Sequence, residues 1–258
     1  MLSIQTNVAS LMAQQNFNTN ANFQTKTIEA ITSGYRINQS GDDAAGLVQA
    51  NQDRSQVTEL TQGVLNANSA LSTLQIADGA MNNISNMLDR LKTLATQAAS
   101  GAGNTTEFND VLTEIDREAA SITPGTLAVY VGGGSSAANS TVNVTLTGVA
   151  SAQLFTATPA IDSAANAKLA IAAINTAVTN LGTAQTAVGA GENALTYATS
   201  LANSQITNTS AAESSIRDAD MASEAANLTK AQTLQQASLA AMAQANSAPQ
   251  AVLSLLKQ

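Results

Sequence analysis

The sequence predicts a mainly α fold, a long antiparallel helical bundle or coiled coil with a small β-hairpin region in the middle of the chain. Three observations support this fold class. Apolar residues recur every three or four positions from Ala45 to Ala99, and a similar rhythm returns after Ala160. The segment between them instead alternates with period two, as strands do.

The first long helix is expected from Ala45 to Ala99, a stretch that no proline interrupts. Its apolar steps alternate between three and four, with one extra step of three at Ala77, a stammer that locally overwinds a supercoil. At a rise of 1.5 Å per residue the helix would be about 80 Å long, so it needs a partner of similar length. The stripe consists of Val57, Leu60, Val64, Ala67, Leu71, Leu74, Ala77, Met81, Ile84, Leu88, Leu91, Ala95 and Ala98.

The expected partner helix runs from after Ala160 to about Ile216. Three glycines lie within it, and each costs about 1 kcal/mol relative to alanine in a helix. They either permit close helix approach or break the helix, and both readings stay open. A shorter helix from Thr105 to Ala120 completes the bundle. The partner's apolar stripe consists of Ile171, Ile174, Val178, Leu181, Val188, Leu195, Ala198 and Ala202, and its glycines are Gly182, Gly189 and Gly191.

The middle segment, residues 122–160, is expected to form a β-hairpin within the bundle. "TLAVYV" and "TVNVTL" each place apolar residues on one face, and the glycine-rich "GGGSSAANS" joins them. A connection of this length is too long for a tight turn, so its tip should be mobile and exposed. The apolar positions are Leu127, Val129 and Val131 in the first strand and Val142, Val144 and Leu146 in the second.

The two ends of the chain share a character: apolar residues at helical spacing, flanked by amide and hydroxyl side chains rather than by charge. Such helices are marginal alone and become stable when their stripes meet another helix, from the same chain or another copy. We therefore expect three domains or segments: 1–44 with 217–258 as a terminal coiled coil, 45–121 with 161–216 as the bundle, and 122–160 as the hairpin. Pro249 should kink or end the last helix. The terminal stripe residues are Ile4, Val8, Leu11, Leu228, Leu234, Met242, Val252, Leu255 and Leu256.

Composition argues against several classes of function. The chain has no cysteine, histidine or tryptophan, which removes thiolate and imidazole chemistry, so we expect no enzyme, catalytic residue or cofactor. A net charge of −8 disfavours nucleic acid and anionic membranes. No apolar run is long enough to insert into a bilayer. The first residues lack the features of a Sec signal peptide, so we expect the protein to stay in the cytoplasm or to leave uncleaved.

The stretch "SGYRINQSGDDAAGL" raises the question of an acid pair or a metal loop. Asp42 and Asp43 are adjacent, so on a helix they diverge by about 100°. Even with Asp53 nearby, no glutamate completes a calcium-loop spacing, and we expect no metal site. We expect a hinge instead, in which Asp42 or Asp43 caps the long helix. Arg36 and the two acids are then available to contact a neighbouring subunit.

Two motifs resemble a known family. "RIN" followed by "DDAAG" near the start, and "AQAN" followed by "PQAVLSLL" near the end, are similar to bacterial flagellin. The resemblance covers about residues 1–121 and 162–258, and implies a short form that lacks the outer variable domains. In such a form the termini pair in an inner tube and the bundle forms an outer tube.

The resemblance also implies a function and partners. The chain would be a structural subunit that self-assembles into the bacterial flagellar filament for motility, outside the cell and exported without a cleaved signal peptide. Its partners would be other flagellin copies, an export chaperone, the flagellar type III export apparatus, and the filament cap and hook-associated proteins. A hook-filament junction protein, which shares the terminal coiled coil, is the alternative.

In many flagellins the long helix is also read by Toll-like receptor 5 of animal hosts. The matching positions here are Arg90, Leu94 and Glu107. The other interpretation is that these residues stack subunits along a protofilament. The sequence departs from the family pattern at Asp89, where glutamine is common, and in "EAASITPG" after "EIDR", which leaves the hairpin register open.

Overall fold

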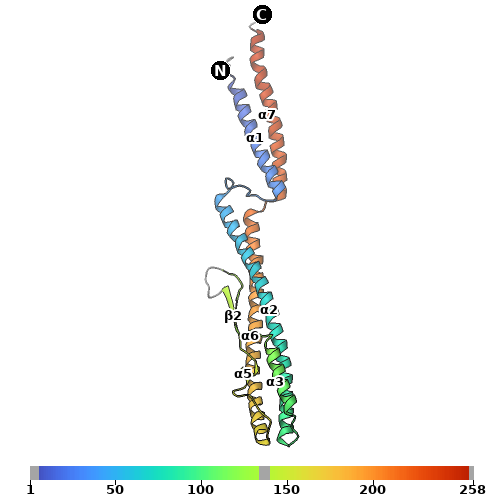
Figure 1. The fold of residues 1–258 in the computed structure, drawn as a ribbon. Helices are drawn as coiled ribbons and strands as arrows, with labels where there is room; N and C mark the ends of the chain where they lie inside the picture. Colours follow the sequence, from blue (N-terminus) through green and yellow to red (C-terminus); the bar gives the residue numbers. More distant parts are fainter. Residues whose placement is uncertain (1–5, 134–139, 256–258) are drawn as a thin grey trace. The chain divides into compact units, whose positions relative to one another are not determined.

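The structure is a computed structural model that describes residues 6–133 and 140–255. Its long helices and one two-stranded sheet confirm the predicted fold class (Figure 1). The elements are α1 (Val8–Ser33), α2 (Ala44–Ala99), α3 (Thr105–Ala119), β1 (Gly125–Tyr130), β2 (Thr141–Leu146), α5 (Ser151–Leu154), α6 (Ala164–Arg217) and α7 (Met221–Leu255). Contacts divide the chain into two compact units, Met1–Arg54 with Ser210–Gln258, and Ser55–Thr209. The long helices α2 and α6 contribute to both.

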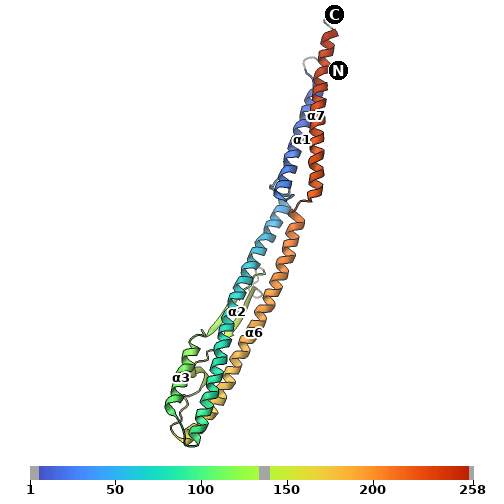
Figure 2. The same ribbon diagram turned by 90° about the vertical axis from the view of Figure 1, so that its right-hand side faces the viewer.

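In the unit Ser55–Thr209, α2 and α6 run antiparallel and side by side (Figures 1 and 2). The predicted α2 stripe is confirmed, because every member is buried except Val57, Val64 and Leu71, which are half-buried. The stripe on α6 is confirmed with one correction. Val178 is exposed, and Ala177 is buried in its place. A step of three or of four from Ile174 satisfies the same rhythm, and the small alanine is the residue that faces α2.

The β-hairpin is confirmed, and its register is now defined. β1 and β2 are antiparallel, with Leu127 opposite Val144 and Val129 opposite Val142. The buried and half-buried positions alternate with exposed ones from Thr126 to Tyr130 and from Val142 to Leu146. The tip of the connection, residues 134–139, lies outside the described residues.

Two glycines let the hairpin lie directly on the long helices. A Cβ added at Gly63 of α2 would lie 1.9 Å from the Val131 carbonyl oxygen. One added at Gly191 of α6 would lie 2.4 Å from Val144 Cγ1. Helix α6 is unbroken, so the broken-helix reading of its glycines is wrong. The close-approach reading holds for Gly191 alone and involves a strand rather than a helix, since Gly182 and Gly189 face open space.

The short helix α3 packs beside α2 and closes the end of this unit. Its amphipathic face buries Phe108, Leu112 and Ile115. At its start the Asn104 side chain accepts a hydrogen bond from the Glu107 backbone amide at 3.2 Å, which caps the helix. The Asp116 carboxylate accepts hydrogen bonds from the backbone and hydroxyl of Ser151, and so fixes the first turn of α5.

In the unit Met1–Arg54 with Ser210–Gln258, α1 and α7 lie side by side (Figures 1 and 2). Helix α7 continues to Leu255, so Pro249 does not end the last helix, and the alternative of a kink at Pro249 stays a prediction. Among the described residues, no helix carries an apolar stretch sufficient to cross a membrane.

Candidate functional site

The contact between α1 and α7 is made by small side chains. The buried positions are Ala13, Thr27 and Ala30 on α1, with Ala231 and Ser238 on α7. Short polar bonds cross the contact: Asn20 Nδ2 donates to Ser238 Oγ at 3.0 Å, and Asn7 Nδ2 donates to the Ala245 carbonyl at 2.7 Å. Small residues allow close approach but bury little apolar area, so this pair has a thin core of its own.

Many large apolar residues of the same helices are at the surface. They are Val8, Leu11, Met12, Phe23 and Ile28 on α1, and Met221, Leu234 and Leu239 on α7. Exposed apolar side chains gathered on one pair of helices mark an interaction surface.

The residues predicted for inner-tube assembly fall into three groups. Val8, Leu11 and Leu234 are exposed, whereas Leu228 and Met242 are half-buried. The remaining four, Ile4, Val252, Leu255 and Leu256, lie outside the residues whose side chains the structure describes.

The segment after α1 is bonded to the end of α6. Gly34 ends α1 in the left-handed conformation, with φ of 76°. The backbone amide of Arg36 donates to the Arg217 carbonyl at 2.7 Å, and its guanidinium donates to the Ile216 carbonyl at 2.6 Å. The Arg217 guanidinium in turn lies 4.2 Å from the centre of the Tyr35 ring. Arg36 therefore satisfies carbonyl groups that the last turn of α6 leaves free.

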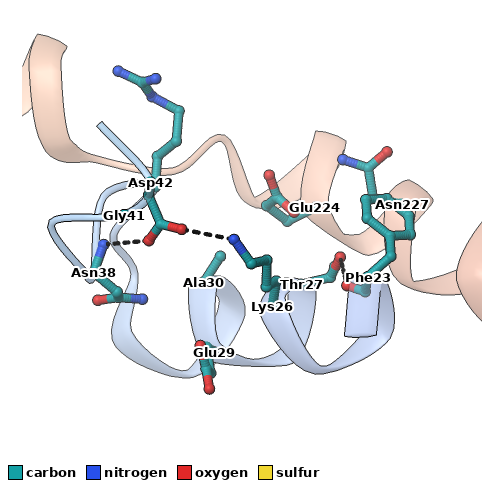
Figure 3. Close-up of a pocket in the computed structure, with 11 residues that line it drawn as sticks. Phe23, Lys26, Thr27, Glu29, Ala30, Asn38, Gly41, Asp42, Glu224 and Asn227 are labelled. Carbon is teal, nitrogen blue, oxygen red and sulfur yellow. Dashed lines mark hydrogen bonds and ion pairs between the residues drawn. The ribbon is translucent and has the colours of Figure 1, made fainter. Parts of the chain in front are cut away.

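Asp42 and Asp43 have different roles. Asp43 Oδ1 accepts the Gly46 amide at 2.9 Å and caps α2. Asp42 points the other way, toward α1, where Lys26 Nζ lies 3.0 Å from its Oδ1 (Figure 3). The amides of Asn38 and Gln39 donate to its other oxygen. Hydrogen bonds lower the pKa of Asp42. The one from Lys26 has the largest effect, and those from the two amides add to it.

Beside this carboxylate lies an open pocket of about 280 Å³. Its walls carry charges of both signs, and Figure 3 shows Lys26, Glu29, Asp42 and Glu224 around it. In the part of the chain that the structure describes, no three acidic side chains gather as metal ligands would. Asp53 is buried elsewhere and bonded to Gln49. Donors of the chain itself bond the carboxylates of Asp42 and Asp43, and we call the segment between α1 and α2, together with Lys26 and the last turn of α6, the joint.

Arg90 and Glu107 form an exposed pair between α2 and α3. Arg90 Nε donates to Glu107 Oε1 at 2.9 Å, and its Nη2 bonds the same oxygen. Leu94 differs, because only 1% of it is exposed and it belongs to the core of its unit. The prediction of a surface role for Leu94 is therefore wrong. The three-four spacing places Ala95 in the apolar stripe, and the buried face of α2 is wide enough to include its neighbour Leu94 as well.

Sequence reasoning missed Lys26, Tyr35 and Arg217 as parts of the joint. Lys26 looks like any solvated lysine on a helix, and its partner Asp42 follows a bend in the chain. Tyr35 and Arg217 come from opposite ends of the sequence. No local pattern signals either pair.

Known proteins resemble the chain over nearly its whole length. The family model for the bacterial flagellin N-terminal helical region matches residues 4–123, and that for the C-terminal helical region matches residues 171–256. A flagellin of Halalkalibacterium halodurans is 34% identical, covering 98% of this chain and 99% of that protein. The flagellar filament 33 kDa core protein of Treponema phagedenis is 32% identical with the same coverage. A crystal structure of Bacillus cereus flagellin matches with a TM-score of 0.47 and 26% identity, over 58% of this chain and 94% of that one.

Proposed function

This chain belongs to the bacterial flagellin family, and from that premise we propose that it self-assembles, through its terminal helices, into a flagellar filament that drives motility. Flagellins are structural filament subunits rather than enzymes, and the filament that they form is extracellular.

The observation that carries the proposal is the contrast within the terminal pair. Small residues are buried between α1 and α7, while Leu11 and Leu234 face solvent. A helix pair that exposes its large apolar side chains gains stability when other copies cover them. We therefore assign residues 1–44 with 217–258 to the inner tube and residues 45–121 with 161–216 to the outer tube, with the hairpin of 122–160 on the latter.

The same features favour export in an unfolded form. The terminal pair buries little apolar area, and the chain has no cysteine that could oxidise outside the cell. In this proposal a chaperone covers the C-terminal helix before the flagellar type III apparatus exports the chain without cleavage. At the growing end the subunit then meets the filament cap and the hook-associated proteins.

Deletion of the last residues tests the proposal. Purified full-length chain added to filament seeds should elongate them into long filaments in negative-stain images. A chain truncated before Pro249 should remain folded by circular dichroism and should not elongate them. Growth of the truncated chain would contradict the inner-tube assignment. A full-length chain that is folded and never elongates seeds would favour a junction protein instead.

A second candidate function is recognition by Toll-like receptor 5. The observation that favours it is the exposure of the Arg90 side chain, 51%, in its pair with Glu107. An arginine held at the surface by one carboxylate keeps donors free for bidentate or stacked contacts. Leu94 takes no part in this proposal, since it is buried. Stacking of subunits along a protofilament is the competing use of the same surface.

A further inference from the structure

Within the unit Ser55–Thr209 the outward face of α6 is uncharged over a long stretch. Residues 193–209 contain no Asp, Glu, Lys or Arg. Two large side chains one turn apart project from this stretch: Tyr197 is 75% exposed and Leu201 is 60% exposed. A solvated helix face ordinarily carries charge, whereas this one carries only hydroxyl and amide groups beside its apolar residues.

Three hydroxyl groups on the same stretch of α6, those of Thr196, Ser204 and Thr207, already have acceptors within the helix. Thr196 donates to the Glu192 carbonyl at 2.8 Å, Ser204 to the Ser200 carbonyl at 3.1 Å, and Thr207 to the Asn203 carbonyl at 3.0 Å. Burying a polar group is costly when its donor loses its partner. Because these three donors are satisfied within the helix, another protein surface can cover them without leaving them unpaired, and it would have to offer an acceptor to the Tyr197 hydroxyl.

A groove lined by both apolar and polar atoms lies beside this face. Its walls are formed by Val131, Gly132 and Val142 of the hairpin and by Ala198, Leu201 and Gln205 of α6, and its volume is about 580 Å³. A groove of this kind can receive an apolar side chain from outside. The exposed leucine on its rim thus borders a recess rather than a flat surface.

Helix α2 presents a second face with the same properties. Residues 60–77 are uncharged, and Leu65 and Ile76 are 57% and 63% exposed. These two residues lie on the side of α2 away from the buried positions Leu74 and Ala77. The hydroxyls of Ser72 and Thr73 donate to carbonyls one turn earlier, as on α6.

The two faces lie at the same level along the helix pair. Gln185 of α6 donates to Asn82 of α2 at 3.3 Å, just beyond one end of both stretches. Near the other end the hairpin bridges them, since a Cβ at Gly132 would lie 3.3 Å from Leu60 and one at Gly133 would lie 3.9 Å from Gln205. Because each helix turns its core stripe toward the other, the two uncharged faces point in different directions from the pair.

Charge selects the occupant of these faces. The unit Ser55–Thr209 has four Lys and Arg against ten Asp and Glu, a formal net charge of −6. Five of the acids lie on α3 alone. Two copies repel each other wherever such surfaces meet, and they repel least through uncharged faces. A basic partner would choose the acidic face of α3 instead.

We propose that the α6 face around Tyr197 and Leu201 of one copy packs against the α2 face around Leu65 and Ile76 of the next copy. Two different patches then meet at each contact, which is the heterologous geometry that generates open filaments rather than closed dimers. The inference rests on the proposed assembly into a filament, and it assigns one lateral surface of that assembly to named residues.

Cross-linking between introduced thiols tests the contact, because the chain has no cysteine of its own. The double variant Leu65→Cys/Leu201→Cys is polymerised on seeds, treated with a short bismaleimide and run on a denaturing gel. We expect a ladder of trimers and longer oligomers, whereas each single variant stays monomeric. The unpolymerised double variant, and filaments of Asn109→Cys/Leu201→Cys, which places a thiol on the exposed surface of α3, should give no ladder.

Each result that contradicts the proposal identifies which part of it is wrong. Dimers from Leu201→Cys alone would show that the α6 face pairs with itself, and filaments of the double variant without a ladder would overturn the contact. Absence of filaments from the unaltered chain would instead defeat the proposed function, and the interface with it.

A charge pair gives an independent measurement. Leu201→Lys alone should slow elongation about tenfold, because a charge is buried without a partner. Adding Leu65→Glu in the same chain should restore growth at low salt, and about 1 M salt should remove the rescue by screening. A double variant as slow as the single variant at low salt would contradict a contact between these two faces.

Discussion

The carbonyl oxygen of Val131 occupies the place that a side chain would need at Gly63. A Cβ there would lie 1.9 Å from that oxygen and 2.3 Å from the carbonyl carbon, so the hairpin backbone rests on bare α2 backbone. At Gly191 the obstacle is a side chain, Val144, which has rotamers to change. The first contact is therefore the less forgiving of the two.

Gly63→Ala should destabilise the protein even though alanine favours helix. Overpacking typically costs about 1–3 kcal/mol, against a gain in helix propensity of about 1 kcal/mol. Gly189→Ala is the matched control, because Gly189 is also in a long helix and faces open space. Thermal unfolding of the monomer should show a lower midpoint for Gly63→Ala and an equal or higher one for Gly189→Ala. Equal effects of the two substitutions would exclude the close approach.

The Lys26–Asp42 pair should make part of the stability depend on acid. The pKa of Asp42 is lowered in the folded chain, chiefly by the hydrogen bond from Lys26. Its contribution is thus present above the unfolded pKa, near 4, and is lost as pH falls through the folded value.

The test compares urea midpoints of the unaltered chain and of Asp42→Asn at pH 7 and below pH 4. The variant should be less stable at pH 7, and the difference should shrink in acid. Asp110→Asn, on the exposed surface of α3, should show no such pattern. A difference that stays constant with pH would mean that the charge of Asp42 is not what stabilises the joint.

The cap at the start of α2 should matter for the filament. Asp43→Ala removes the acceptor of the Gly46 amide, which should cost about 1 kcal/mol. Asp43→Ser keeps a capping oxygen and should recover most of that loss. Filaments of the alanine variant should depolymerise at a lower temperature than those of the serine variant. If filaments of the unaltered chain and of both variants depolymerised at the same temperature, Asp43 would have no role in filament stability.

The sequence was informative where the cause of structure is local. The stripe from Leu60 to Ala98 is visible in the sequence because its buried residues lie on one face of one helix and so recur every three or four positions. The alternation in β1 and β2 is equally local. Residues that act through a distant neighbour carried no such signal: Gly63 looks like a weak point in a helix until Val131 is placed on it.

The candidate site shows the same division. The sequence predicts that the cap of α2 is Asp42 or Asp43. Only the direction of each carboxylate shows that Asp43 caps the helix and that Asp42 bonds Lys26. Leu94 was placed at the surface by the resemblance to flagellins and not by its spacing, and the structure shows that it is buried beside the stripe residue Ala95.

Receptor recognition, if it uses the Arg90–Glu107 surface, should be lost with the arginine and not with a cation elsewhere. Purified monomer is applied to reporter cells that carry Toll-like receptor 5, and Arg90→Ala is compared with Lys168→Ala on α6. Loss of a central arginine costs more than 1.4 kcal/mol at many interfaces, so Arg90→Ala should need at least about tenfold more protein for the same signal. Lys168→Ala should match the unaltered chain.

The Arg90–Glu107 pair contributes little to the free energy of folding, since exposed ion pairs contribute about 0–1 kcal/mol. A lost signal in a folded variant therefore reports on the contact with the receptor. No signal from any of the three proteins would reject the receptor and leave Arg90 to subunit stacking.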